Sequence, residues 1–265
     1  MIANVLSIAG SDPSGGAGIQ ADIKAISANG AYAMAAITGL TAQNTQGVSA
    51  VSLCDPALVA EQIRMVRADI RVDAVKIGML GSAEIVEAVA NALQGLEAPV
   101  VLDTVMVAKG GDRLLQADAV AALRGVLLPR ATVITPNLPE AADLLGEPEV
   151  SDETGMERQA DALRDLGAQS VLLKGGHLSG EKSRDLLVND AGRHWFDGPR
   201  VATKNTHGTG CTLSSAMAAL LGKGVPLQQA VEQAKGFVAE AIMASDQLEV
   251  GQGHGPTHHF HALWK

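Results

Sequence analysis

The segment NTHGTGCTLSSAMAALLG, Asn205 to Gly222, has the composition of an anion-binding helix start. Its first turn would consist of Gly208, Thr209, Gly210 and Cys211. The run that follows is apolar on every side, so this turn is expected to be buried and its backbone N–H groups could converge on one anion. The helix dipole is expected to lower the pKa of the Cys211 thiol and favour the thiolate. A small buried residue in a helix cap would also explain Cys211.

Polar side chains also stand where several predicted strands end. Asp103 ends a buried strand, where an unpaired carboxylate is unfavourable, so a metal, a lysine or a bound hydroxyl is expected nearby. Lys174 ends another strand and Lys76 a third. Asn137 and Glu140 lie three residues apart at a predicted helix start. Taken alone, this pair is more typical of an N-cap and its capping-box partner than of a metal site.

The elements that must position these residues alternate along the chain. Short apolar runs predict strands at Val5–Ala9, Met34–Thr38, Ala74–Ile77, Val100–Leu102, Thr132–Ile134 and Ser170–Leu173. Helices are predicted at Gly18–Asn29, Pro56–Ala68, Ala83–Leu93, Ala117–Arg124, Pro139–Leu145, Gly155–Leu166, Gly210–Leu221 and Leu227–Ser245. Apolar strands separated by helices predict an α/β fold with a mostly parallel sheet covered on both faces. Leu186–Asn189 and His194–Phe196, joined by NDAG, predict a hairpin at its edge.

In such sheets, ligands bind beyond the carboxyl ends of the strands. The loops expected there are polar or rich in glycine: GSDPSGGAG, TAQNTQG, GML, DTVMVAKGGD, TPNLPE and KGGH. Together they predict the rim of an active site. The uncharged stretch from Ala25 to Cys54 is interrupted by glycines and amides, which predicts a buried strand followed by a loop.

Composition narrows the classes of function. A net charge of −9 and 2% aromatic residues argue against a nucleic-acid surface. The two cysteines, Cys54 and Cys211, lack the spacing of a disulfide framework or zinc site. The N-terminus has no signal-peptide pattern and no run suits a membrane span, so a cytoplasmic protein is expected. Its length favours a single domain, residues 1–265.

Three weaker patterns have simpler explanations. The segment Gly16–Ala21 fits a loose dinucleotide-binding fingerprint, but the acidic residue that would bind the ribose is missing, which favours a tight turn. GEKS, at Gly180–Ser183, lacks the spacing of a phosphate-binding P-loop. The C-terminal segment holds His254, His258, His259 and His261, whose spacing favours a docked or frayed end over a metal site.

Several segments occur in an order that resembles one family: IAGSDPSGGAGIQADIKA, GLTAQNTQGV, KIGML, VVLDTVMVAKGGD, ITPNLPEAADLL, LLKGGH and KNTHGTGCTLSSA. They resemble the hydroxymethylpyrimidine/phosphomethylpyrimidine kinases of thiamine biosynthesis, in the ribokinase superfamily. The resemblance covers essentially the whole chain. It implies a three-layer α/β/α sandwich and the phosphorylation of 4-amino-5-hydroxymethyl-2-methylpyrimidine, and then of its monophosphate, with ATP and Mg2+.

The resemblance also implies roles for individual residues. Cys211 would be the base beside the substrate hydroxyl, where related kinases carry aspartate, and the N–H groups of the Gly208–Cys211 turn would stabilise the transferred phosphoryl group. The amide of Gln43 would match the ring nitrogen and amino group of the pyrimidine. The rest of the substrate pocket would be formed by Gly10, Asp22, Thr41, Met79 and Val105. ATP would contact Lys174, Asn137 and Thr206, and Mg2+ would be organised by Asp103 and Glu140, with help from Asn137.

Ala108–Asp112 would form a flap over the site, and a homo-oligomer, most simply a dimer, is expected. The nearest alternative function is a pyridoxine or pyridoxal kinase on the same scaffold. A thiol hydrolase or transferase would need His207 as the base for Cys211, and a non-catalytic nucleotide-binding module is the last alternative.

Overall fold

The computed structural model describes residues 1–106, 117–176, 178 and 182–264. Its main sheet has eight strands in the order β10-β9-β8-β7-β6-β5-β1-β2. The strands are β1 (Asn4–Ala9), β2 (Tyr32–Ile37), β5 (Ala74–Ile77), β6 (Val100–Leu102), β7 (Val133–Ile134), β8 (Val171–Lys174), β9 (Asp185–Asn189) and β10 (Gly192–Phe196). Neighbours from β2 to β8 pair in parallel, and β9 and β10 add an antiparallel hairpin at the edge. The predicted sheet and its edge hairpin are confirmed.

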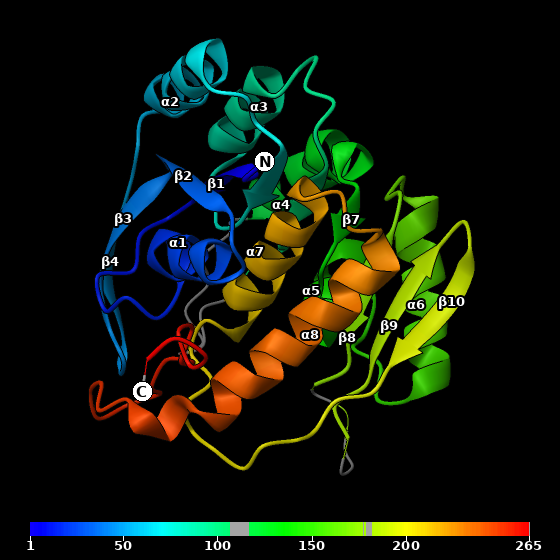
Figure 1. Ribbon diagram of the computed structural model, residues 1–265. Coiled ribbons are helices and arrows are strands. Elements are labelled where there is room, and N and C mark those ends of the chain that lie inside the picture. The colour runs from blue at the N-terminus through cyan, green and yellow to red at the C-terminus, as the bar shows by residue number, and fades with distance from the viewer. Residues whose placement is uncertain (107–116, 177, 179–181, 265) are drawn as a thin grey trace.

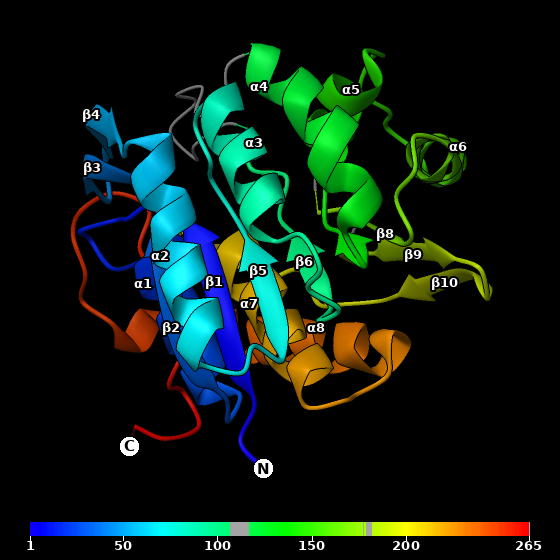
Figure 2. The ribbon, with the colours of Figure 1, turned by 90° about the horizontal axis from the view of Figure 1, so that it is seen from above.

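Helices cover both faces of this sheet, so the predicted three layers are also confirmed (Figures 1 and 2). One face packs on α1 (Gly18–Ala28), α7 (Thr209–Gly222) and α8 (Leu227–Met243). The other packs on α2 (Pro56–Asp69), α3 (Ala83–Ala92), α4 (Ala117–Ala122), α5 (Leu138–Leu145) and α6 (Glu153–Asp165). The strands are apolar throughout because each of their faces lies under helices.

Helix α7 is deeply buried. It packs on α1 and α8 and contacts β1, β5 and β6, and its residues from Thr212 to Leu220 are all buried. This explains why the segment is apolar all round rather than amphipathic. Figure 1 shows α7 crossing the middle of the sheet, so its first turn is held in the centre of the molecule.

A second, two-stranded sheet was not predicted. β3 (Gly39–Asn44) and β4 (Gly47–Leu53) pair antiparallel, where the sequence had predicted only a loop after the second strand. The prediction was wrong because β4 has no buried face: its residues are half-buried or exposed, so they show no alternation of apolar and polar side chains. Figure 1 shows the ribbon standing off the edge of the sheet near β2.

A smaller difference concerns the helix predicted at Ala117–Arg124. The α-helical hydrogen bonding of α4 ends at Ala122, and the chain continues as a π-helical turn, Leu123–Leu127, and a short 3-10 turn, Leu128–Arg130. The wider turn keeps Leu123, Leu127 and Leu128 buried in the core, so packing of these leucines, rather than the local helical pattern, determines where the helix ends.

Candidate active site

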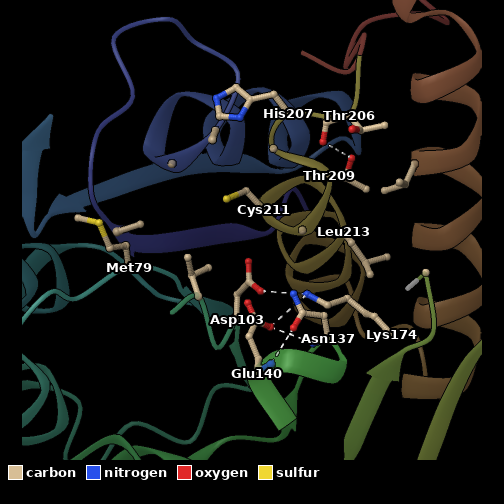
Figure 3. A pocket seen from close by; sticks show the side chains of 18 of the residues that line it. Met79, Asp103, Asn137, Glu140, Lys174, Thr206, His207, Thr209, Cys211 and Leu213 are labelled. Atoms are coloured by element: carbon tan, nitrogen blue, oxygen red, sulfur yellow. Dashed lines mark hydrogen bonds and ion pairs between the residues drawn. The ribbon is translucent and has the colours of Figure 1, made fainter. Parts of the chain in front are cut away.

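A cavity of about 760 Å3 lies at the carboxyl ends of the parallel strands. It brings together nearly all of the residues selected from the sequence. Its lining includes Gly10, Thr41, Gln43, Met79, Asp103, Val105, Asn137, Glu140, Lys174, Thr206, Gly208, Thr209, Gly210 and Cys211. Figure 3 shows part of this wall, with Cys211 at the start of α7 and the charged side chains of Asp103, Glu140 and Lys174 below it. The proposed flap, Ala108–Asp112, lies outside the described residues.

The start of α7 has a backbone that only glycine suits. Gly208 is the N-cap, with a left-handed φ of 76°, and a Cβ atom there would lie 1.8 Å from the carbonyl oxygen of Gly16. The turn is further held by Thr209, whose Oγ1 donates to the carbonyl of Thr206 at 2.7 Å. Because the first N–H groups of a helix lack intrahelical acceptors, those of Gly210 and Cys211 are free of the α7 ladder and suited to an anion.

Cys211 does not have the electrostatics expected from its place at a helix start. Burial raises the pKa of its thiol to about 12, and the carboxylates of Asp22 and Asp103 act in the same direction. The ammonium of Lys76 and a hydrogen bond from the Gly18 backbone N–H to the sulfur oppose this shift without cancelling it. The expected thiolate is therefore wrong for the free protein: desolvation outweighs the effect of Lys76, and Cys211 is a neutral thiol at pH 7.

Asp22 is the predicted substrate residue that does not line the cavity. It lies beneath the wall, fully buried, with Lys76 Nζ 2.9 Å from both of its carboxylate oxygens. Ser7 Oγ and Ser215 Oγ donate to the same carboxylate at 2.6 and 2.8 Å. Lys76 itself lines the cavity. Asp22 thus acts on the site through Lys76, because Asp22 keeps the positive charge of Lys76 in the cavity wall.

A second cluster of charge surrounds Lys174. Its Nζ lies 3.5 Å from Asp103 Oδ1 and 3.8 Å from Glu140 Oε2, as the dashed lines in Figure 3 show. Burial alone would lower the pKa of Lys174, but Glu140 and Asp103 outweigh burial and raise it. Asp103 also accepts from Ser214 Oγ at 3.1 Å and Thr135 Oγ1 at 3.3 Å. The expectation that Asp103 would need a lysine or hydroxyl nearby is confirmed.

Asn137 and Glu140 form the capping box that their spacing suggested. Asn137 Oδ1 accepts from the Glu140 backbone N–H at 2.8 Å, and Glu140 Oε2 accepts from the Asn137 backbone N–H at 2.9 Å. Burial raises the pKa of Glu140, although Lys174 opposes the shift. The cap does not exclude a role in the cavity, because both residues also line it.

The donor set near Lys174 suits magnesium. Mg2+ commonly takes one or two carboxylates and completes its shell with water and substrate phosphates. Asp103 and Glu140 supply such hard oxygen ligands and line one cavity. In the part of the chain that the structure describes, no group of three or more His, Cys, Asp or Glu side chains could hold a metal ion by itself.

At the other end of the cavity, Gln43 lies in a row of polar side chains. Its Oε1 is 3.3 Å from Thr41 Oγ1, and its Nε2 is 3.4 Å from His207 Nε2. His207 Nε2 is in turn 2.7 Å from Asp12 Oδ2. No sequence pattern had indicated Asp12 itself, and His207 was expected only as the base that a thiol enzyme would need. The signal for Asp12 was its place in GSDPSGG, a loop already expected at the rim.

The C-terminal segment is docked rather than frayed. The His207 backbone N–H donates to Gly255 O at 3.0 Å, and Thr212 Oγ1 is 3.0 Å from His259 Nε2. Burial lowers the pKa of His259 to about 4, so this side chain is neutral at pH 7. The segment therefore closes over the turn before α7.

No helix in the described ranges is long and apolar enough to cross a membrane.

Comparison with known proteins agrees with this geometry. A family model described as phosphomethylpyrimidine kinase matches residues 12–258. The chain is 53% identical over 262 residues to the hydroxymethylpyrimidine/phosphomethylpyrimidine kinase of Escherichia coli (strain K12), with 98% of each chain covered. An ADP complex of Bacillus subtilis pyridoxal kinase has a TM-score of 0.91 and 37% identity, covering 100% of both chains. The phosphomethylpyrimidine kinase from Clostridium difficile 630 has a TM-score of 0.80 and 41% identity, covering 91% of this chain and 100% of that chain. Fold, cavity and sequence similarity together identify this chain as a member of the phosphomethylpyrimidine kinase family.

Proposed function

We propose that this protein transfers the γ-phosphoryl group of ATP to the hydroxyl of 4-amino-5-hydroxymethyl-2-methylpyrimidine. It then phosphorylates the resulting monophosphate to the diphosphate, as a step of thiamine biosynthesis. The chain is a phosphotransferase of the family described above, and the ADP complex of a related kinase supports ATP as the donor.

The observation that carries the proposal is the position of the α7 start between two different halves of one cavity. A Cβ atom on Gly210 would lie 3.5 Å from Lys174 Nζ and 3.7 Å from Asp103 Oδ2, so the charged cluster is on one side of the turn. On the other side, the Cys211 sulfur accepts from the N–H of Gly18, the first residue of α1, which follows the loop that carries Asp12. A phosphate group and an alcohol could therefore meet at Gly210 and Cys211.

The phosphate half of the site would act by charge stabilisation. The ammonium of Lys174 and the N–H groups of Gly210 and Cys211 can all face the same anion, and Asn137 and Thr206 line the same cavity. Negative charge on the transferred group is spread over its oxygens in the transition state, so fixed donors in a buried site lower its energy most.

The alcohol half would act by orientation. Gln43 offers a donor and an acceptor side by side, which matches an aminopyrimidine edge, and Gly10, Thr41, Met79 and Val105 complete the walls. Gly10 leaves space that a side chain would take, since its Cβ would lie 2.3 Å from Met79 Cε. Held in this way, the hydroxyl would lie beside Cys211.

Cys211 would receive the hydroxyl proton. In a loose phosphoryl-transfer transition state, proton loss from the attacking oxygen needs little base strength. Because burial keeps the free thiol neutral, only its small ionised fraction could accept a proton, and Lys76 raises that fraction by lowering the thiol pKa. Lys76 is thus assigned a supporting role.

Magnesium would be held by Asp103 and Glu140, directly or through water, and would supply positive charge for the phosphates of ATP. The Lys174 ammonium lies 3.5 Å from Asp103 Oδ1 and 3.8 Å from Glu140 Oε2, so it stands beside both candidate ligands. Lys174 and the metal would then share the phosphate oxygens.

The test is ADP release from purified protein with the aminopyrimidine, its monophosphate, pyridoxine or no alcohol, each with and without Mg2+. We expect the aminopyrimidine to give the highest kcat/KM and Mg2+ to be required. A preference for pyridoxine would support the pyridoxal kinase alternative, which has less support because the identity to the Bacillus subtilis pyridoxal kinase is 37% against 53% for the Escherichia coli enzyme. ADP release that no alcohol stimulates would contradict both functions.

The thiol hydrolase alternative has less support. Within the described ranges, the ring of His207 makes its hydrogen bonds to Asp12 and Gln43 rather than to Cys211. The proposed homodimer and cytoplasmic location are separate predictions, tested by light scattering on a sizing column and by cell fractionation.

A further inference from the structure

Asp12, His207, Gln43 and Thr41 form a row of hydrogen-bonding side chains. Only some arrangements of their hydrogen atoms give every donor an acceptor. Asp12 Oδ1 accepts from the Ser14 N–H at 2.9 Å and from Ser14 Oγ at 2.7 Å. Its Oδ2 accepts from the Ala17 N–H at 2.8 Å and contacts His207 Nε2 at 2.7 Å. Burial raises the pKa of Asp12, but hydrogen bonds from His207 and Ser14 outweigh it and hold the pKa below its ordinary value. Asp12 is therefore a carboxylate, which only accepts.

This assigns the hydrogen on the imidazole. Because Asp12 accepts, His207 Nε2 must carry a hydrogen and donate it. The same nitrogen then has no lone pair for the Gln43 amide group, which lies 3.4 Å away. A carboxamide oxygen at that position could instead share the Nε2–H with Asp12 in a three-centre hydrogen bond.

The Thr41 hydroxyl, at the other end of the row, leads to the same orientation of the Gln43 carboxamide. Thr41 Oγ1 lies 2.9 Å from the carbonyl oxygen of Ser11, which can only accept, so the single Thr41 hydroxyl hydrogen points there. Toward Gln43, at 3.3 Å, Thr41 Oγ1 must therefore accept. It needs an N–H from the carboxamide, not an oxygen. The two ends of a carboxamide have nearly the same shape, and turning it by 180° satisfies both neighbours.

The surroundings hold the imidazole in place. A Cβ atom on Gly16 would lie 2.4 Å from His207 Cδ2, so the loop after β1 packs directly on the ring edge. The docked C-terminal segment binds the backbone of His207 through Gly255. His207 and Asp12 are mostly buried, with 10% and 2% of their side chains exposed. The imidazole therefore cannot turn its Nε2–H away from Asp12 and Gln43.

We propose that Asp12 and His207 are positioning residues that fix the Gln43 carboxamide with its oxygen toward His207 and its nitrogen toward Thr41. This inference rests on the proposed function, in which Gln43 pairs with the aminopyrimidine. The second N–H and the second oxygen lone pair of the Gln43 carboxamide, which these neighbours do not use, are then presented in one order only. The N–H on the Thr41 side meets the ring nitrogen N3, and the oxygen on the His207 side meets the 4-amino group.

This order also decides where the reacting hydroxyl goes. In the substrate, N3, the 4-amino group and the 5-hydroxymethyl group follow one another around the ring. With the amino group on the His207 side, the hydroxymethyl group extends past it toward the residues that follow His207, which are Gly208 to Cys211. The opposite carboxamide orientation would direct the hydroxyl toward Thr41, away from α7. Asp12 and His207 would thus link ring recognition to the direction of phosphoryl transfer.

The test compares two alcohols that differ only in hydrogen-bond order. The 4-oxo analogue, 5-hydroxymethyl-2-methylpyrimidin-4-one, presents a donor at N3 and an acceptor at C4. We expect the wild-type chain to prefer the amine by roughly 100-fold or more in kcat/KM, because two buried hydrogen bonds are mispaired with the analogue. In His207→Leu the carboxamide can turn, and the preference should fall below about 10-fold. The ratio is measured on one preparation, so the fraction of active protein cancels.

Three further variants sharpen the result. His207→Gln keeps an N–H donor at a similar reach and should retain the preference within about threefold of the wild type. Asp12→Asn can donate to the imidazole, so Nε2 becomes an acceptor and the preference should shift toward the 4-oxo analogue. If His207→Leu does not fold, as judged by its thermal unfolding, Thr41→Val releases the other end of the carboxamide and should also lower the preference.

The outcomes separate this inference from the proposed function. A folded His207→Leu, or Thr41→Val in its place, with the wild-type preference would overturn the inference while the kinase function stands. A wild-type chain that phosphorylates pyridoxine but neither pyrimidine would overturn the function and, with it, this role of Gln43.

Discussion

Lys76 Nζ lies 2.9 Å from both carboxylate oxygens of Asp22, and neither side chain is exposed to solvent. Burial alone would lower the pKa of Lys76, but Asp22, together with Cys211 and Asp103, outweighs burial and raises it, so Lys76 is an ammonium at neutral pH. Cys211 experiences both charges: the ammonium lowers the thiol pKa and the carboxylate raises it. The pair therefore links the stability of the core to the electrostatics of the cavity.

Replacing Lys76 with methionine should destabilise the protein. Lys76→Met leaves the Asp22 carboxylate buried without its partner, which typically costs about 3–5 kcal/mol in the free energy of unfolding. The double variant Lys76→Met/Asp22→Asn removes both charges and should recover much of that loss. Urea unfolding measured on the two variants gives the comparison. Equal losses in both would mean that packing of the lysine stem, rather than an unpaired charge, is responsible.

The rate should rise with pH if Cys211 acts as a base. With a thiol pKa of about 12, the ionised fraction increases about tenfold per pH unit through the neutral and mildly alkaline range. We therefore expect kcat with the aminopyrimidine to increase from pH 7 to pH 9 without reaching a plateau. A kcat that stays level over this range would contradict the base assignment.

Two substitutions at Cys211 separate the base from the backbone anion site. Cys211→Ala keeps the N–H groups of the turn and should lower kcat by roughly 10²–10⁴-fold while ATP affinity changes little. Cys211→Asp supplies a carboxylate and should restore part of the rate with a much weaker dependence on pH. Full activity in Cys211→Ala would leave the backbone, metal and substrate positioning as the whole catalyst. Detection of phosphorylated Cys211 during turnover would indicate a nucleophile instead.

Glu140→Gln distinguishes a metal role from a capping role. Glutamine can still accept from the Asn137 N–H, so the capping box and the fold should survive. The lost charge should raise the Mg2+ concentration needed for half-maximal activity, because one of two candidate carboxylates is gone. The measurement is a magnesium titration of kcat beside a thermal unfolding curve. Unchanged Mg2+ dependence would leave Glu140 as a capping residue only.

Gln43→Met tests recognition of the pyrimidine edge. Methionine keeps the length of the side chain but removes both hydrogen bonds, so KM for the aminopyrimidine should rise roughly 10–100-fold, about 1.4–2.7 kcal/mol. Pyridoxine presents a different edge and should be affected less. Steady-state kinetics with both alcohols provide the comparison, and equal losses would show that Gln43 has a structural role instead.

The sequence by itself determined the layers of the fold and the composition of the cavity. Strands covered on both faces are apolar throughout, and the helices between them carry their own local patterns, so β1, β5 and β6 could be located within a residue or two. Parallel strands then bring their carboxyl-end loops to one edge of the sheet. For that reason residues as far apart as Gly10 and Asp103 could be expected at one edge of the sheet before the fold was known, and the family resemblance added Cys211 to them.

Only the tertiary structure decided how charges and hydrogen atoms are arranged inside that cavity. The Asp22–Lys76 pair joins residues 54 positions apart, and the Asp12–His207 pair joins residues 195 positions apart. No local pattern indicates such partners. The pKa of Cys211 depends on how far neighbouring loops exclude water, and strand β4 has no buried face to leave a signal in the sequence. Local patterns determine which segments fold as helices and strands, whereas desolvation and long-range pairing depend on the packed surroundings of each group.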